Sequence, residues 1–223
     1  MASTPSKRMV TEQLHPRGIK DPAVLRAMEE VSRDAFVPST FRDLAWADTA
    51  LPISHGQTIS QPYVVALMTE ALAPAAGDRI LEIGTGSGYQ AAVLAHIGVE
   101  VFTVERLPAL AHRARRTLAA EGYEVHLRCD DGTIGWPEEA PFDGILVTAS
   151  GPTIPNPLLE QLSIGGRLVF PLATDHGQTL VLITRKEDGL FRRHELAQVA
   201  FVPLIGREGY PEEATGSSST PSP

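Results

Sequence analysis

The chain has 223 residues, 43% of them hydrophobic, which is enough to bury the core of one domain of generous size. No apolar run approaches the roughly 20 residues of a membrane-spanning helix, and the polar N-terminus lacks the apolar stretch of a secretory signal. The single cysteine, Cys129, excludes an internal disulfide and a multi-cysteine metal site, the seven histidines show no metal-ligand spacing, and the net charge of −8 disfavours nucleic acid as the main partner.

Two helices are expected in the first third of the chain. The Asp-Pro pair at residues 21–22 is typical of a helix N-cap followed by proline at the first helical position, and apolar residues then recur at helical spacing to Val31. A second helix is expected to begin near residues 60–62, with its apolar side chains in one stripe. Residues 37–57, between these helices, are rich in turn-forming residues and predict a loop.

From residue 79 the pattern changes to alternating strands and helices. Strands are expected at 79–83, 99–104, 125–128, 144–147, 167–170, 179–184 and 199–202, and helices at 89–96, 107–120 and 157–162. This alternation predicts an α/β fold with a doubly wound, mainly parallel, seven-stranded sheet. The last strands have little helix between them, which indicates an antiparallel strand near one edge.

We expect one domain overall, in three parts. Residues 1–78 form a helical and loop segment that packs on a core of residues 79–206. The remainder, residues 207–223, has almost nothing to bury and is expected to be a disordered tail.

The strongest local signal is the glycine-rich loop Leu81–Tyr89. Glycines at alternate positions after a buried strand let the backbone turn sharply and pass close to a ligand, in the crevice where open α/β sheets bind their ligands. A glycine-rich turn without a ligand is the alternative. A dinucleotide fingerprint would place the third glycine one position later. The acidic residue two positions before the first glycine completes a pattern that resembles the first motif of the class I methyltransferases, carried here by Glu82, Gly84, Thr85, Gly86 and Gly88.

That resemblance implies S-adenosylmethionine as the cofactor, with the loop around its methionine part. Glu105 ends the second core strand, where a carboxylate can accept both ribose hydroxyls, although the same position occurs in nicotinamide enzymes and a solvated strand-end charge is the alternative. Asp131 and Gly132 match the position that approaches adenine in this class, and the same dipeptide also suits a tight turn.

Segments outside the glycine loop narrow the resemblance to one family. They are Gly18-Ile19, Phe36-Val37-Pro38, Leu51-Pro52-Ile53, Gly56-Gln57-Thr58-Ile59-Ser60-Gln61-Pro62, Pro141-Phe142-Asp143, residues 161–171 and Phe201-Val202-Pro203-Leu204. Together they resemble the protein-L-isoaspartate O-methyltransferases over residues 15–205, and the run from Gly56 to Pro62 is the most specific of them. The implied reaction transfers a methyl group from S-adenosylmethionine, leaving S-adenosylhomocysteine, to the α-carboxylate of isoaspartyl residues. The ester then collapses to a succinimide, which begins the repair of damaged proteins.

The resemblance also implies that Ser60 is the catalytic residue and that Thr58 and Ile59 lie with it beside the cofactor. The start of a helix favours an anion, and a serine hydroxyl can donate to one oxygen of the acceptor. An ordinary helix N-cap is the alternative for this serine. The acceptor carboxylate is already ionised at neutral pH, so the chemistry needs no general base, and His55 is not expected to act as one.

The sequence leaves three other functions open. They are a methyltransferase dedicated to an aspartate of one peptide, a non-catalytic peptide-binding relative and, more distantly, a nicotinamide dehydrogenase. For the favoured function we expect a cytoplasmic, metal-free monomer whose partners are isoaspartyl-containing proteins and peptides. Nucleic acids and membranes are not expected partners.

Overall fold

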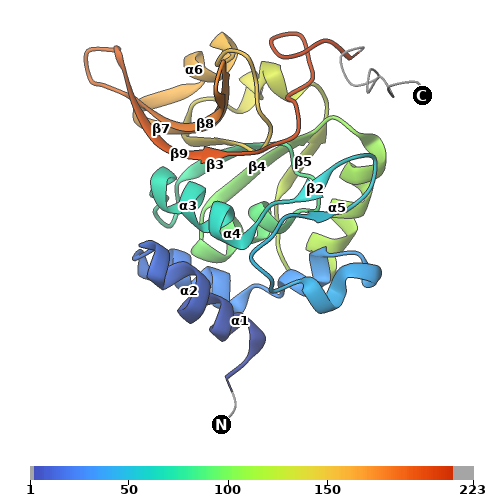
Figure 1. Cartoon of the computed structure of the whole chain (residues 1–223). Coiled ribbons are helices and arrows are strands. Elements are labelled where there is room, and N and C mark those ends of the chain that lie inside the picture. The colour runs from blue at the N-terminus through green and yellow to red at the C-terminus, as the bar shows by residue number, and fades with distance from the viewer. Residues whose placement is uncertain (1–2, 213–223) are drawn as a thin grey trace, which may run out of the picture.

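A seven-stranded sheet with the order β5-β4-β3-β6-β7-β8-β9 organises residues 3–212, the part of the chain that the computed structural model describes (Figure 1). The strands are β3 Arg79–Ile83, β4 Glu100–Glu105, β5 His126–Cys129, β6 Phe142–Val147, β7 Leu162–Thr174, β8 Gly177–Arg185 and β9 Phe191–Val199. The strands from β5 to β7 pair in parallel, whereas β8 is antiparallel to both β7 and β9. The predicted α/β fold with a mainly parallel sheet of seven strands is therefore confirmed.

The helices are α1 Pro5–Met9, α2 Pro22–Glu30, α3 Pro62–Leu72, α4 Tyr89–Ile97, α5 Pro108–Ala120 and α6 Asn156–Glu160. Helices α3, α4 and α5 cover one face of the sheet and α6 lies on the other, whereas α2 packs on α3 and α4 and α1 packs on α2. Successive residues of a strand point to opposite faces. Ile80 accordingly belongs to the hydrophobic cluster under α3, α4 and α5, and Leu81 belongs to the cluster that contains Leu158 of α6. Burial on both faces explains why the apolar residues Ile80 and Leu81 are adjacent in β3 rather than alternating with polar ones.

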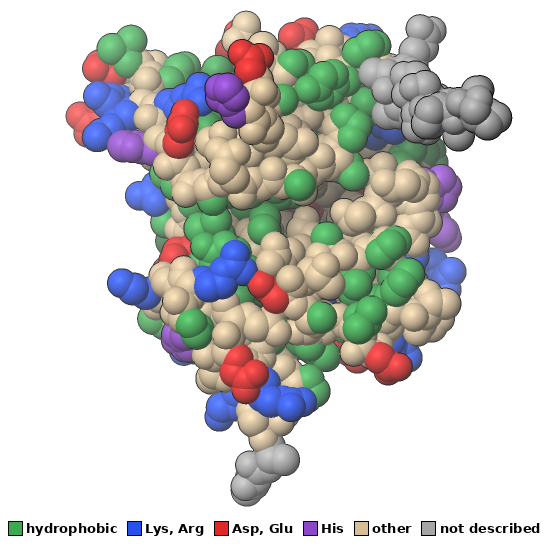
Figure 2. All heavy atoms as spheres, in the orientation of Figure 1, with side chains coloured by type: hydrophobic (Ala, Val, Ile, Leu, Met, Phe, Trp, Pro, Cys, Tyr) green, Lys and Arg blue, Asp and Glu red, His purple; other side chains and the backbone are tan. Residues whose placement is uncertain are grey.

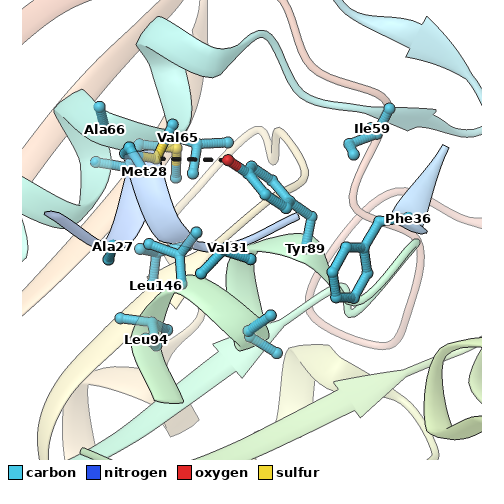
Figure 3. Packing of buried hydrophobic residues seen from close by; sticks show 14 of the residues in the cluster. Ala27, Met28, Val31, Phe36, Ile59, Val65, Ala66, Tyr89, Leu94 and Leu146 are labelled. Atoms are coloured by element: carbon cyan, nitrogen blue, oxygen red, sulfur yellow. Dashed lines mark hydrogen bonds between the residues drawn. The ribbon is translucent and has the colours of Figure 1, made fainter. Parts of the chain in front are cut away.

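The N-terminal segment shares the first of these clusters with the sheet. In Figure 3, Met28 of α2 lies against Val65 and Ala66 of α3 and accepts a hydrogen bond from the hydroxyl of Tyr89 of α4 (3.8 Å). The ring of Phe36 packs against that of Tyr89, with 5.8 Å between the centroids. Burial raises the pKa of Tyr89 to about 12, so its hydroxyl stays neutral in this core.

The capping of α2 agrees with the sequence, but the chain before α2 differs. Asp21 Oδ1 accepts hydrogen bonds from the amides of Ala23 (2.8 Å) and Val24 (3.1 Å), as an N-cap does. Residues 5–17 are also helical, although the sequence pattern predicts no helix there. Their only buried side chains are Met9, Val10 and Leu14, which are too few to give a helical signal in a polar sequence, although Val10 and Leu14 have helical spacing.

The predicted loop at residues 37–57 contains some regular structure. It includes a 3₁₀ segment, Ser39–Leu44, and the strand β1 Leu51–Pro52, which pairs antiparallel with β2 Thr58–Ile59. This two-stranded hairpin leads directly into the residues before α3. Within residues 3–212, no helix has both the length and the apolar character needed to cross a membrane.

The strand expected at residues 199–202 was wrong, because the last strand, β9, occupies Phe191–Val199. β9 is an edge strand, and Arg192, Arg193, His194 and Glu195 are exposed on it, so it lacks the apolar pattern that marks the central strands. The apolar residues 200–203 instead leave the sheet. The amide of Leu204 then donates to Ser150 O at 2.7 Å.

Residues 207–212, which we expected to be tail, fold back on the core. The amide of Tyr210 donates to Leu204 O (2.7 Å), and the amide of Arg207 donates to Asp131 Oδ2 (2.8 Å). These contacts are made by backbone amides, which composition does not reveal. The rest of the expected tail, residues 213–223, lies outside the described residues.

Candidate active site

The loops at the carboxyl ends of β3, β4 and β6 line two adjoining cavities, where an open α/β sheet binds its ligands. The first cavity, of about 500 Å³, is lined by the glycine turn after β3, by Ser60 and by residues 197–202. The second cavity, of about 580 Å³, is lined by Glu105 and Gly132. Five residues line both cavities: Thr58, Gly84, Gly86, Thr148 and Val202. The two spaces therefore meet at the glycine turn.

The glycine turn needs its first glycine for two reasons. Gly84 has a φ of +94°, which side chains of L-residues rarely adopt. A Cβ atom at Gly84 would also lie 2.4 Å from Thr148 Oγ1. The Thr148 hydroxyl donates to Gly84 O at 2.6 Å and to Ile83 O at 3.0 Å. Because Thr148 directly follows β6, the end of β3 is held by the neighbouring strand.

Glu105 holds the same turn from β4. Its Oε2 accepts from the amide of Gly86 and its Oε1 from the amide of Leu107, each at 2.8 Å. The side chain is only 6% exposed and lines the second cavity. Each carboxylate oxygen can accept more than one hydrogen bond. Glu105 can therefore support the turn and still accept from the hydroxyl groups of a ligand.

Glu82 is fully buried on the first cavity. Its Oε2 accepts from Thr103 Oγ1 (2.5 Å), which lies 2.6 Å from Thr85 Oγ1. Its Oε1 has no hydrogen-bond partner among the described residues. Burial raises the pKa of Glu82 to about 8, against the opposing effect of the Thr103 hydrogen bond, and the nearby charge of Glu105 raises it further. Glu82 is consequently mostly neutral at pH 7.

Ser60 lies on the first cavity together with Glu82 and the glycine turn. It is not the N-cap of α3, because that position belongs to Gln61, which makes no side-chain cap hydrogen bond of its own. The hydroxyl of Ser60 forms no hydrogen bond within residues 3–212. This arrangement disfavours the N-cap alternative and leaves the hydroxyl available to a ligand.

Two of the predicted cofactor residues lie away from the two cavities. Gly88 is the N-cap of α4, and a Cβ there would lie 3.2 Å from the side chain of Leu118 of α5, so this glycine permits close helix packing. The carboxylate of Asp131 accepts from Thr133 N (2.9 Å), Thr133 Oγ1 (2.6 Å) and Arg207 N (2.8 Å). Asp131 thus ties the C-terminal segment to the loop that carries Gly132. It lines a separate cavity with Arg106 and Glu212.

The structure also adds residues that the sequence did not single out. They are Asp48, Tyr63, Gln90, Thr148 and residues 197–200, all of which line the first cavity. Thr148 directly follows β6, so its place at a strand end was a usable signal. The others come from a loop, from helices and from the end of an edge strand, and only the folded chain brings them together. Residues 3–212 contain no group of three or more His, Cys, Asp or Glu side chains that could hold a metal ion.

Comparison with known proteins gives a consistent result. The family model for protein-L-isoaspartate(D-aspartate) O-methyltransferase (PCMT) matches residues 5–209. A protein-L-isoaspartate O-methyltransferase 2 from Marinobacter nauticus is 54% identical over 207 residues, covering 92% of this chain and 94% of the relative. A protein-L-isoaspartate O-methyltransferase 1 from Rhodopseudomonas palustris is 55% identical over 206 residues, covering 92% of this chain and 84% of the relative.

Solved structures agree with these relatives. A protein-L-isoaspartate O-methyltransferase superposes with a TM-score of 0.83 at 29% identity, over 92% of this chain and 67% of the other. A Plasmodium falciparum protein, described as a putative protein-L-isoaspartate O-methyltransferase in complex with S-adenosyl-L-homocysteine, has a TM-score of 0.79 at 28% identity, over 91% of this chain and 99% of the other.

The close approach of Thr148 to Gly84 predicts that the single methyl group of an alanine at position 84 destabilises the fold. We expect Gly84→Ala to lower the free energy of unfolding by about 2–4 kcal/mol, because it combines backbone strain with a steric clash. Gly122→Ala is the matched control, since Gly122 has a φ of +79° but no atom within 4 Å of the place that a Cβ would take, and it should cost only about 1 kcal/mol. Urea denaturation of both variants measures this difference, and equal losses would contradict it.

The raised pKa of Glu82 predicts a pH-dependent stability. Between pH 4.5 and about 8 the side chain is ionised in the unfolded chain and protonated in the folded one, so folding takes up a proton and stability falls as pH rises. The slope from this group is at most about 1.4 kcal/mol per pH unit. Glu82→Gln removes this contribution. Its melting temperature relative to the parent chain should therefore increase from pH 5 to pH 8 without added ligand, and a difference independent of pH would refute the assignment.

Proposed function

Because this chain belongs to the protein-L-isoaspartate(D-aspartate) O-methyltransferase family, we propose that its two adjoining cavities hold the cofactor and the acceptor of one methyl transfer. The chain is an S-adenosylmethionine-dependent protein carboxyl O-methyltransferase. It esterifies the α-carboxylate of isoaspartyl residues and so initiates repair through a succinimide. The family, the activity and the cofactor expected from the sequence are confirmed.

The observation that carries the site proposal is that Ser60 and the glycine turn line the same cavity. The turn belongs to the cofactor motif and Ser60 to the segment specific to the family. A methyl group can pass between two ligands only if both reach the same space. The shared lining of the first cavity by Ser60, Glu82 and Gly84 supports this requirement.

We propose that S-adenosylmethionine lies across both cavities, where they meet at Thr58, Gly84 and Gly86. The unpartnered Oε1 of Glu82 fits an amino group at the first cavity. Glu105 and the backbone of Gly132 fit a ribose and an adenine at the second. The bound cofactor supplies an electrophilic methyl group on its sulfonium. Ile59 and Thr85 would contribute to this site through their positions beside Ser60 and Gly84, Gly88 through the packing of α4, and Asp131 through the loop that carries Gly132.

The residues of this chain orient the acceptor rather than activate it. An α-carboxylate has a reference pKa of about 3.3–3.7, so it is ionised at neutral pH and already nucleophilic. The free hydroxyl of Ser60 can donate to one carboxylate oxygen and leave the other directed at the methyl group. Orientation of this kind, with water excluded from the reacting atoms, can supply up to roughly 7–11 kcal/mol of rate enhancement.

The charge state of Glu82 favours an anionic acceptor. At pH 7 this residue is mostly protonated, because burial raises its pKa to about 8. Glu82 itself therefore adds no full negative charge to the first cavity that would repel the acceptor carboxylate. A cationic cofactor that binds beside Glu82 would favour its ionised form and offset that charge.

We infer that the chain acts as a cytoplasmic monomer on damaged proteins in general, and that residues 1–78 and 79–206 work as one domain because they share a hydrophobic cluster. On the face drawn in Figure 2, Lys and Arg side chains are interspersed with Asp and Glu. A nucleic-acid binder would gather them in one basic patch. A methyltransferase dedicated to one peptide is the alternative to action on damaged proteins in general.

The decisive experiment compares methyl transfer to an isoaspartyl peptide and to its aspartyl twin, for the parent chain and for Ser60→Ala. We expect the parent chain to label the isoaspartyl peptide with strong preference. Ser60→Ala should lower kcat about 100-fold, the scale expected when an acceptor loses its orientation, while calorimetry shows retained cofactor affinity.

Ser39→Ala is a suitable control, because Ser39 is exposed on a 3₁₀ segment outside both cavities. It should leave kcat unchanged. Equal labelling of the two peptides would support a different acceptor. Full activity of Ser60→Ala would remove Ser60 from the mechanism while leaving the family activity intact.

A further inference from the structure

Asp48 lies on the first cavity and connects three parts of the N-terminal segment. Its Oδ2 accepts from Arg17 Nη1 (2.6 Å) and from Gln61 Nε2 (2.7 Å). Its Oδ1 accepts from the amide of Tyr63 at 3.3 Å, and its backbone oxygen accepts from Gln61 Nε2 at 3.1 Å. One residue thus bonds to the chain on the C-terminal side of Ser60 at both Gln61 and Tyr63.

The chain on the other side of Ser60 is held separately. Ile59 pairs with Leu51 in the β1–β2 hairpin and is buried. Ser60 is therefore a single residue between two fixed points, the hairpin at Ile59 and the Asp48 contacts at Gln61. Its own side chain has no hydrogen bond within residues 3–212 to set its place. The position of its hydroxyl depends on these two anchors.

Arg17 strengthens the second anchor. Its guanidinium stands over the ring of Tyr63, 3.3 Å from the centroid, while it pairs with Asp48. The side chains of Arg17 and Asp48 are 43% and 26% exposed, so solvent weakens the ion pair itself. The hydrogen bonds from Gln61 and Tyr63 to a charged acceptor are the contacts that restrict the backbone around Ser60.

We propose that Asp48 is a positioning residue, which orients the Ser60 hydroxyl toward the acceptor carboxylate by holding Gln61 and Tyr63. This inference rests on the role of Ser60 proposed above. It differs from a purely structural role, in which Asp48 would only supply the cap acceptor that α3 lacks. A cap contributes to the stability of the helix, whereas a positioning residue affects kcat through Ser60.

The test measures kcat and KM for an isoaspartyl peptide in Asp48→Ala and Asp48→Asn. Asp48→Ala removes the side-chain acceptors for Gln61 and Tyr63, and we expect kcat to fall about 10- to 100-fold, with KM for the peptide and cofactor affinity changing less than about threefold. Asp48→Asn keeps a carbonyl oxygen near the amide of Tyr63 and should recover part of kcat. Assays are run below the melting temperature of every variant.

A double-mutant cycle separates the two roles. If Asp48 acts through Ser60, adding Asp48→Ala to Ser60→Ala should lower kcat by less than about twofold, whereas independent effects would multiply. The control is Asp188→Ala, which removes a comparable contact, Asp188 Oδ1 with Leu190 N at 3.0 Å, in the turn between β8 and β9. It should leave kcat unchanged.

The outcomes assign any failure to one proposal. A multiplicative cycle, or an unchanged kcat in Asp48→Ala while Ser60→Ala is impaired, would overturn the positioning role alone. An unimpaired Ser60→Ala would overturn the proposed role of Ser60, and the inference about Asp48 with it. A loss of kcat in Asp48→Ala that depends on Ser60, together with partial recovery of kcat in Asp48→Asn, would support the proposed roles of both Asp48 and Ser60.

Discussion

The turn after β3 is held by side chains from both neighbouring strands, and the rest of the site depends on it. Thr148, just beyond β6, donates to the carbonyl of Gly84, and Glu105, at the end of β4, accepts from the amide of Gly86. The two contacts come from opposite sides because β3 is central in a parallel sheet. A parallel sheet brings strand ends to one edge, so neighbouring strands can fix the backbone of a turn at its glycines, which have no side chains.

The buried carboxyl of Glu82 gives the first cavity its electrostatic character. A carboxyl group without water is costly to ionise, which is why its pKa rises to about 8. Without a bound ligand Glu82 is mostly neutral and does not repel an anionic acceptor, and in the proposed site a cationic cofactor beside it would favour its ionised form. The chemistry needs orientation and exclusion of water, and the geometry around Glu82 and Ser60 is suited to that task.

The two halves of the site have different structural origins. The cofactor side is built from strand ends of the sheet, whereas Ser60 and Asp48 come from the N-terminal segment. In the shared core, α2 packs on α3 and α4 around Met28 and Tyr89 and so fixes the position of one half of the site relative to the other. The N-terminal segment, which we propose to recognise the acceptor, is thus attached by hydrophobic packing, and the hydrogen bonds of Asp48 restrict the chain after Ser60.

Local signals in the sequence predict the central strands, the glycine turn, the family and nine of the residues that line the two cavities, because periodicity, glycine spacing and the specific run before α3 are all local features. Tertiary structure decided the rest. The edge strand β9 is too polar to be recognised, Asp131 bonds to a segment 76 positions later in the chain, and the partners of Asp48 come from both sides in sequence. Such contacts join residues far apart in the chain. No local sequence pattern predicts these contacts, because the two residues of each contact come together only when the chain folds.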